Sequence, residues 1–401
     1  MMPPEKGEVL LKIAKALVTI AGFGIAFLGL LAGILSFVVP VIRGGESDLL
    51  KATISASLIA LGVGLGLPLA WQGLNSLLGR PSRPFRPWPI PSLAAIFILA
   101  AVWGQAILSF DLLPPLAFPP FHILATALPP LMILAFVGRR LSQAGVRWRD
   151  VILHLSSGAF LAALGAFGLE GVSALLLSLV VFAAVALTPG GEAWLQELVA
   201  NLSDPAWLQD PQNLRQLLLS PAVLAILTSL LTVIAPLIEE FLKPIGVAIM
   251  GYRRPSRAQA FLWGLAGGAG FALVEGLLNG TIALEGWGAM VAMRVGAAAM
   301  HCLGSGLMAL GWHHLFIARR PWHLLAAYAA SVGLHGLWNA AAGGIVVASL
   351  LTTSTAGEWA IGGLALLLLT FLVLLALLAG LAILYLTNML QADISPTSSE
   401  D

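Results

Sequence analysis

Two adjacent carboxylates and a lysine lie inside one of the most apolar stretches of the chain. Glu239, Glu240 and Lys243 interrupt segment 231–251, which is otherwise almost entirely apolar. Insertion scales assign about 2.5–3.5 kcal/mol to one charged side chain at the centre of a membrane helix. Because this stretch carries three such side chains, we interpret it as a functional site.

The next three apolar segments carry polar residues four positions apart. The pairs are Glu275 with Asn279, His301 with Ser305, and His335 with Asn339, and Glu239 with Lys243 has the same spacing. Residues four apart lie on one face of a helix, so each segment is expected to present one polar stripe. Small residues on the same segments would let the helices approach closely. We therefore expect the stripes to meet in one cavity inside the membrane.

These residue types fit hydrolysis of a peptide bond, in a version without metal. Glu239 and Glu240 would activate water and carry out acid/base work, while Lys243 would adjust their charge. His301 and His335 would stabilise the tetrahedral intermediate. Asn339 is the expected donor to the oxyanion.

A metal-dependent version fits the same residues equally well. Two histidines and one glutamate form a known catalytic set for Zn²⁺ that leaves one position for water. The expected ligands are Glu275, His301 and His335, with Glu240 as the base. The sequence contains no His-Glu-x-x-His motif, so this version depends on helices that converge.

The composition places the chain in a membrane. It has 401 residues, of which 59% are hydrophobic and only 10% charged, against about 25% charged residues in soluble domains. The net charge is +1, and the sequence shows no basic patch with interleaved aromatics, so no nucleic-acid partner is expected. Cys302 is the only cysteine, so no intrachain disulfide can form. The composition predicts an all-α, polytopic helical transmembrane bundle whose surface contacts the lipid bilayer.

Ten spans are predicted from the apolar runs. They lie near 10–41, 52–78, 91–112, 119–138, 151–188, 217–250, 258–279, 291–317, 322–350 and 359–389. Arginines and lysines gather in alternate loops, which predicts that both termini are cytoplasmic. We expect an integral protein of a bacterial plasma membrane.

Segment 151–188 is the weak point of this topology, because 38 residues exceed the length of one ordinary span. One long crossing agrees with the later basic loops and is our preferred interpretation. The alternative is a hairpin that turns at residues 168–171. Glu170 is accordingly expected at a bend or near the end of a span.

The organisation follows from these spans. We predict an N-terminal transmembrane block of unknown role at 1–188, an amphipathic connecting loop at 189–216 and a catalytic bundle at 217–350. A C-terminal span at 351–390 and a disordered tail at 391–401 complete the chain. Most tryptophans, including Trp263 and Trp287, are expected in an aromatic belt at the membrane interface. His122 and His154 are expected near the interfaces, without a role in chemistry.

Four motifs follow one another on consecutive apolar segments. They are Glu-Glu-x-x-Lys (Glu239, Glu240, Lys243), Phe-x-x-x-Glu (Phe271, Glu275), an Arg before a mid-span His (Arg294, His301) and His-x-x-x-Asn (His335, Asn339). In this order they resemble the PrsW family of intramembrane proteases, which is related to CAAX-processing and bacteriocin-processing membrane proteases. The resemblance covers about residues 217–344. The resemblance implies cleavage of a membrane-associated protein substrate, which for the family's namesake is an anti-sigma factor.

Two other functions agree with buried acids and histidines. A proton-coupled secondary transporter would use them as a relay, although the acids gather in one half of the chain without a paired half. An inactive protease-like membrane scaffold would keep the fold without the chemistry. The complete set of Glu, His and Asn residues favours the peptidase.

Overall fold

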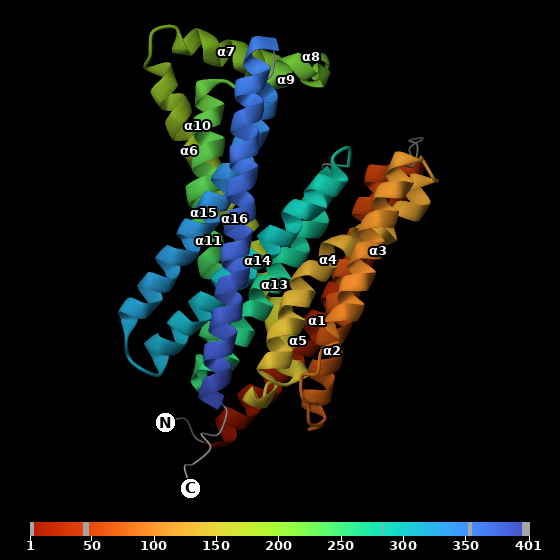
Figure 1. The fold of residues 1–401 in the computed structure, drawn as a ribbon, viewed down its shortest axis with the longest axis vertical. Helices are drawn as coiled ribbons and strands as arrows, with labels where there is room; N and C mark the ends of the chain where they lie inside the picture. Colours follow the sequence, from red (N-terminus) through yellow and green to blue (C-terminus); the bar gives the residue numbers. More distant parts are fainter. Residues whose placement is uncertain (1–3, 43–47, 283, 352–354, 395–401) are drawn as a thin grey trace.

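The chain forms a helical bundle in a computed structural model that describes residues 4–42, 48–282, 284–351 and 355–394. Within these ranges every regular element is a helix (Figure 1). Ten helical segments there are long and apolar enough to cross a membrane. The predicted all-α bundle of about ten spans is therefore confirmed.

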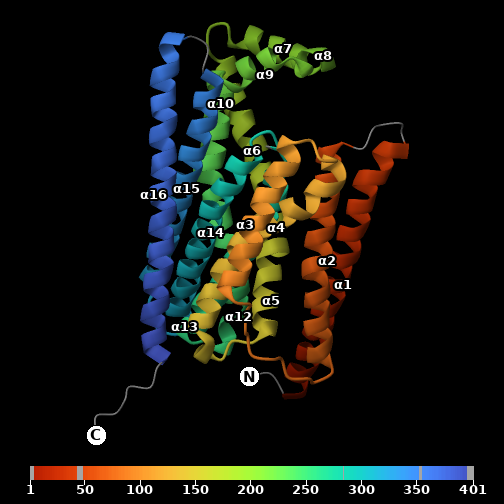
Figure 2. The ribbon, with the colours of Figure 1, turned by 45° about the vertical axis from the view of Figure 1, so that its right-hand side comes forward.

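The first four helices of the chain come before the first 3₁₀ turn, at residues 142–144. They are α1 (Pro4–Ile42), α2 (Leu49–Leu77), α3 (Ile90–Ser109) and α4 (Pro114–Arg140). Helices α1 and α2 lie side by side along one flank of the molecule (Figure 2). Their backbones meet at Gly29 and Gly62, where a Cβ atom on either residue would overlap the other backbone. Helix α4 packs on α2, on α3 and on the later helix α13, so it joins the flank to the rest of the bundle.

The long segment after the 3₁₀ turn η1 (Ser142–Ala144) is one continuous helical run. It consists of α5 (Trp148–Ser156), a π-helical turn η2 (Ser157–Ala162) and α6 (Ala163–Ala186). The chain does not reverse at residues 168–171, so the hairpin alternative is wrong and Glu170 lies inside a straight helix. A π turn contains one residue more than an α turn and is common at functional sites.

Three short helices follow, and they lie across one end of the bundle (Figures 1 and 2). They are α7 (Gly191–Leu202), α8 (Pro205–Gln209) and α9 (Pro211–Leu218). Asp204 and Asp210 begin α8 and α9 by accepting hydrogen bonds from the backbone amides of Ala206 and Gln212. The three short helices connect α6 to α10, and their position at the membrane surface stays a prediction.

The segment that carries the glutamate pair is interrupted twice. It consists of α10 (Pro221–Ser229), a second π turn η3 (Leu230–Ile234), α11 (Ala235–Leu242) and α12 (Ile245–Met250), followed by the 3₁₀ turn η4 (Gly251–Arg253). The break between α11 and α12 falls at Lys243 and Pro244, because proline has no N–H to donate to the carbonyl of Glu240.

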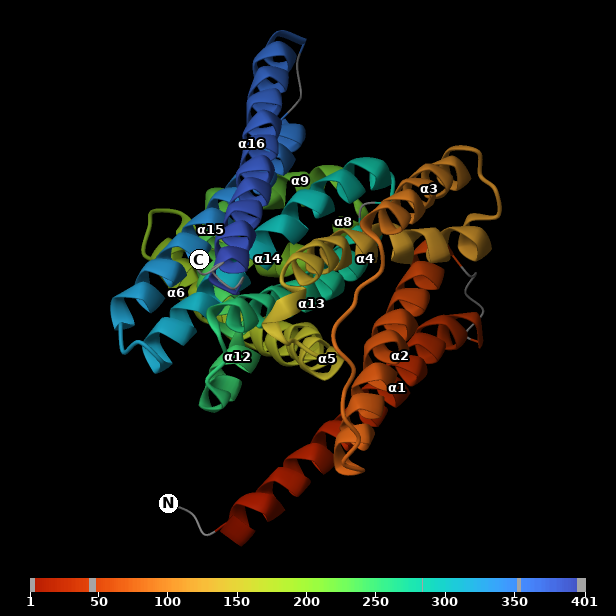
Figure 3. The ribbon, with the colours of Figure 1, turned by 60° about the horizontal axis from the view of Figure 1, so that its bottom comes forward.

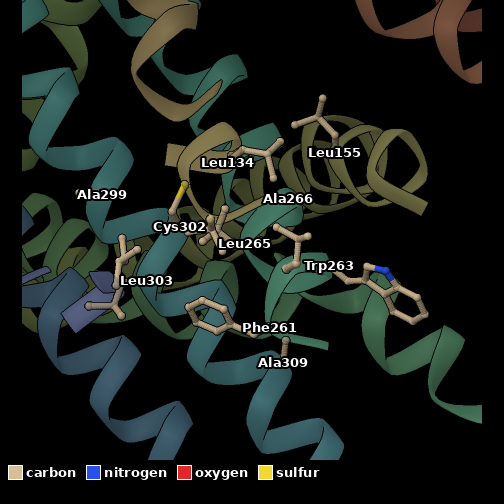
Figure 4. Packing of buried hydrophobic residues seen from close by; sticks show 14 of the residues in the cluster. Leu134, Leu155, Phe261, Trp263, Leu265, Ala266, Ala299, Cys302, Leu303 and Ala309 are labelled. Atoms are coloured by element: carbon tan, nitrogen blue, oxygen red, sulfur yellow. The ribbon is translucent and has the colours of Figure 1, made fainter. Parts of the chain in front are cut away.

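The last four helices provide the core. They are α13 (Arg257–Ile282), α14 (Trp287–Phe316), α15 (Pro321–Leu351) and α16 (Thr355–Ile394). Helices α13 and α14 are the most buried, and Figure 3 shows them among α4, α5, α15 and α16. Leu265 of α13 packs in the same cluster as Leu134, Leu155 and Cys302 (Figure 4). The buried Cys302 therefore serves packing.

The first turns of α1 and the last turns of α16 lie at the same end of the bundle (Figures 1 and 2). An even number of spans requires this arrangement. Helix α16 continues to Ile394, beyond the predicted end of the last span, and residues 395–401 of the predicted tail lie outside the described residues.

Candidate active site

The ammonium group of Lys243 is the centre of the polar cluster. Its Nζ lies 2.9 Å from Oε2 of Glu239 and 2.7 Å from Oε1 of Glu240. The same atom lies 2.8 Å from Nδ1 of His301 and 3.4 Å from Nδ1 of His335. Lys243 is fully buried, and its charge is also 4.5 Å from the centre of the Phe271 ring. Residues of all four predicted motifs therefore lie around one atom.

Glu240 is the inner member of the glutamate pair, with 1% of its surface exposed. Its Oε1 accepts hydrogen bonds from Lys243 and, over 2.8 Å, from Nδ1 of His335. Its Oε2 is buried and accepts no hydrogen bond from the described residues. That oxygen points at Gly304 of α14, where a side chain would collide with it.

His335 of α15 is fixed from both ring nitrogens. Nδ2 of Asn339, one turn further on, lies 3.2 Å from Nε2 of His335 and 2.9 Å from the carbonyl oxygen of Leu231. Because the amide donates to Nε2, the proton of the neutral ring is on Nδ1, which donates to Glu240. Asn339 thus orients His335 here, and its role at an oxyanion stays a prediction.

His301 of α14 has the opposite tautomer. Lys243 donates to its Nδ1, so Nε2 carries the proton and contacts Oε2 of Glu275 over 2.5 Å. Glu275 is held in turn by Arg294 over 3.1 Å and by Asn279 over 3.2 Å. A carboxylate behind a histidine is the usual arrangement for orienting an imidazole that binds a metal.

Glycines of α13 bring these helices together. A Cβ atom on Gly268 would collide with the carbonyl oxygen of His301, and one on Gly267 would crowd the carbonyl oxygen of Lys243. Only glycine allows backbones to approach this closely. The predicted close packing around the site is therefore observed at both residues.

Three of the clustered residues could hold a metal ion. Ligand atoms of Glu239, His301 and His335 all lie within 4.8 Å of one another, and all three residues are buried. The sequence-based set had Glu275 in place of Glu239, whereas here Glu275 contacts His301 and Arg294. One carboxylate and two imidazoles suit Zn²⁺. The residues fit a cation for a second reason, because the positive charge of Lys243 already lies among these three side chains.

One carboxylate outside the predicted stripes lies on a helix that packs against the site. Glu170 was expected at a bend or near the end of a span, but it lies inside α6, which packs on α11, the helix of Glu239. The available signal for this packing was the residue spacing, since Ala162, Ala166 and Glu170 follow each other at four-residue intervals on one helix face.

The remaining polar residues of the predicted stripes have structural surroundings. Ser305 is fully buried near Gly268, and its hydroxyl has no hydrogen-bond partner among the described residues. Ser331 donates to the carbonyl oxygen of Gly304 over 3.1 Å and so ties α15 to α14 beside Glu240.

Comparison with known proteins agrees with this geometry. Residues 146–381, more than half of the chain, match the family model described as PrsW family intramembrane metalloprotease. The match begins before α5 and therefore includes Glu170 as well as the four motifs. No curated protein and no solved structure matched the chain. From the family match, which spans every residue of the polar cluster, we conclude that this protein belongs to the PrsW family of intramembrane metalloproteases and is a peptidase.

Proposed function

We propose that the protein cleaves a membrane-associated protein substrate at a site formed by α11, α13, α14 and α15. The observation that carries this proposal is the buried group of Glu239, His301 and His335, whose ligand atoms lie within 4.8 Å of one another inside apolar spans. We propose that these three residues hold a divalent metal, with Zn²⁺ as the ion that suits them. A Zn²⁺ ion there would act as a Lewis acid on the scissile carbonyl and make the attacking water more acidic.

The other residues would orient this set. Without a metal, Glu240 and Asn339 hold the His335 ring from its two nitrogens, and a metal bound at one nitrogen would replace one of these partners and keep the other. Glu275, itself paired with Arg294, holds His301. Orienting partners of this kind are typically worth 10–100-fold in metal affinity or activity.

Proton transfer is assigned to Glu240. No described residue donates a hydrogen bond to its Oε2. This oxygen is therefore free to take a proton from water. The proton would then pass to the leaving amine as the carbon–nitrogen bond breaks. Lys243, paired with both glutamates, would offset one of their two negative charges.

The proposal extends to the substrate and to the location of the enzyme. We propose a regulatory membrane protein such as an anti-sigma factor, cleaved in a bacterial plasma membrane by an enzyme whose termini are both cytoplasmic. Support comes from the depth of the site within the spans and from the basic loops at the end of the bundle where α1 begins.

The test is a mass-spectrometric survey of new protein termini in membranes of cells that express the wild type or the double variant Glu239→Gln/Glu240→Gln. New termini are expected only with the wild type, and the matching intact proteins should accumulate with the variant. The control is Glu192→Gln/Glu197→Gln, because both residues are exposed on α7 and the change in charge is identical.

Identical surveys for the wild type and the double variant, at equal expression in the membrane, would exclude the glutamate pair from catalysis. Loss of cleavage in the α7 control would show instead that the change in charge alone is responsible.

A further inference from the structure

A groove lies between the flank pair α1 and α2 and the helices beside the site. It has a volume of about 340 Å³ and is lined by residues of α1, α2, α5, α12 and the turn η4. Helix α1 packs mainly on α2, so the groove forms where α1 passes α5 and α12. The lining residues come from the parts of these helices at the end of the bundle where α1 begins (Figures 1 and 2). None of them belongs to the polar cluster around Lys243, and the volume is in the range of ordinary ligand sites.

The walls of the groove are largely apolar. They include Leu11 and Val18 of α1, Leu69 of α2, Leu153 of α5 and Met250 of α12. Leu69 and Met250 are 6% and 8% exposed, whereas Leu11, nearer the start of α1, is 44% exposed. Apolar walls of this kind gain free energy when a hydrocarbon chain covers them, and a small soluble anion would leave them in water.

Three basic side chains line the same groove, and none of its described lining residues is acidic. The basic residues are Lys15, Arg149 and Arg253. Asp150 lies 3.7 Å from Arg253 and offsets one of the three charges. Glu8 is one further acid on α1, and it pairs with Lys12 over 2.9 Å. The groove therefore keeps a positive charge beside its apolar walls.

The guanidinium group of Arg149 has one donor that the protein does not use. Its Nη2 donates to the carbonyl oxygen of Arg80 over 2.9 Å. Its Nε is buried, and no residue in the described ranges accepts a hydrogen bond from it. Buried donors almost always have an acceptor, so this nitrogen indicates a bound group that supplies one. A phosphate oxygen is a strong acceptor for a guanidinium donor.

We propose that this groove binds one anionic phospholipid, with its phosphate among Lys15, Arg149 and Arg253 and an acyl chain along the apolar walls. Basic pockets between membrane helices are suited to anionic headgroups. A zwitterionic lipid would bring a cation of its own to the three basic side chains and would bind more weakly. The bound lipid would join α1 to α5 and α12. This inference does not depend on the proposed chemistry of the active site.

Native mass spectrometry of the full-length protein in detergent tests the inference. Dioleoyl phosphatidylglycerol or dioleoyl phosphatidylcholine is added in increasing amounts, and the lipid-bound fraction gives an apparent Kd. We expect tighter binding of phosphatidylglycerol by the wild type. The variant Lys15→Gln/Arg149→Gln/Arg253→Gln should bind it roughly 100-fold more weakly, because each basic side chain near an anionic lipid contributes about 5-fold.

The matched control removes three basic side chains at the same end of the bundle but outside the groove. It is Lys12→Gln/Arg319→Gln/Arg320→Gln, in which all three positions are exposed. The change in net charge equals that of the groove variant. The control should therefore bind phosphatidylglycerol like the wild type, and a loss as large as that of the groove variant would overturn the inference by showing that net charge alone attracts the lipid.

Equal binding of the two lipids by the wild type would also overturn the inference, as would equal binding of phosphatidylglycerol by the wild type and the groove variant. Lys15→Gln is a second test that keeps the contact between Arg149 and Arg80, so it does not disturb the start of α5. It should weaken binding about 5-fold, and unchanged affinity would overturn the placement of the phosphate. Glycerol phosphate, added as a competitor, should leave the lipid bound. Displacement at an equal concentration would assign the groove to a soluble anion instead.

Discussion

Nζ of Lys243 lies 2.8 Å from Nδ1 of His301, so a permanent cation already occupies the space between the proposed metal ligands. The same nitrogen lies 2.9 Å from Oε2 of Glu239 and 3.4 Å from Nδ1 of His335. The lysine and a metal ion would therefore seek the same donors. Metal binding must move the ammonium group toward Glu240, its closest partner at 2.7 Å.

This competition predicts the behaviour of Lys243→Met. Removing one partner of a buried ion pair typically destabilises a protein by about 3–5 kcal/mol, so the metal-free variant should unfold at a lower temperature than the wild type. Its affinity for Zn²⁺ should rise, because two carboxylates lose their internal cation. Thermal unfolding in chelator and a Zn²⁺ titration measure the two effects. Lys12→Met is the control, since its ion pair with Glu8 is exposed. Weaker Zn²⁺ binding by Lys243→Met would contradict the competition.

Asn339→Ala should lower peptidase activity more than stability. The substitution removes the hydrogen bond that fixes the tautomer of His335, and it leaves the carbonyl of Leu231 without this donor. We expect a loss of roughly 10–100-fold in cleavage and about 1 kcal/mol in stability. Asn388→Ala removes an exposed hydrogen bond from Arg140 and should leave both unchanged. Full activity of Asn339→Ala would argue that His335 needs no partner at Nε2.

Arg294→Gln tests the chain of contacts behind His301. Without the guanidinium group, Glu275 loses the ion pair that holds it against the imidazole. We expect metal affinity and cleavage to fall together, with partial recovery in Arg294→Lys. The comparison is Arg257→Gln, which breaks an ion pair with Asp393 of the same kind whose members are 39% and 43% exposed. Exposed ion pairs contribute about 0–1 kcal/mol to stability, so Arg257→Gln should change metal affinity and cleavage very little.

Gly268→Ala should separate α13 from α14. The new methyl group would collide with the carbonyl oxygen of His301, which forces the helices apart and moves the imidazole. We expect lower thermal stability and loss of Zn²⁺ binding. Gly168→Ala is the matched change on α6, where the methyl group meets no neighbour, and it should be neutral or stabilise the helix by about 0.5–1 kcal/mol. Equal stability of Gly268→Ala and the wild type would contradict the close packing.

Contacts within one helix could be predicted from the sequence. Glu239 with Lys243, Glu275 with Asn279 and His335 with Asn339 were each expected on one face, and each pair is in contact. This succeeds because four-residue spacing fixes relative position whatever surrounds the helix.

Contacts between helices were harder to predict, because they depend on how each helix is rotated. The sequence favoured Glu275 as the carboxylate beside the histidines, and the structure groups Glu239 with them.

Two tryptophans were assigned wrongly to the membrane interface. Trp287 is 1% exposed, and its indole N–H donates to Nδ1 of His122 over 3.0 Å. Trp263 is 4% exposed and stacks on His154. Composition alone suggests a belt for tryptophan. For Trp287, the buried His122 that accepts the N–H makes an interior position acceptable, whereas the N–H of Trp263 has no acceptor among the described residues.

The π turn η3 has a consequence for insertions and deletions in this chain. Such a turn holds one residue in excess of an α-helix, so deletion of one residue within Leu230–Ile234 would restore a regular helix and keep Glu239 in phase with α10. In the deletion variant, however, the carbonyl of Leu231 would accept a backbone hydrogen bond within its own helix. The side chain of Asn339 would then lose the acceptor that holds it. A length variant at this position would keep its glutamates in place and lose the alignment of a histidine on another helix.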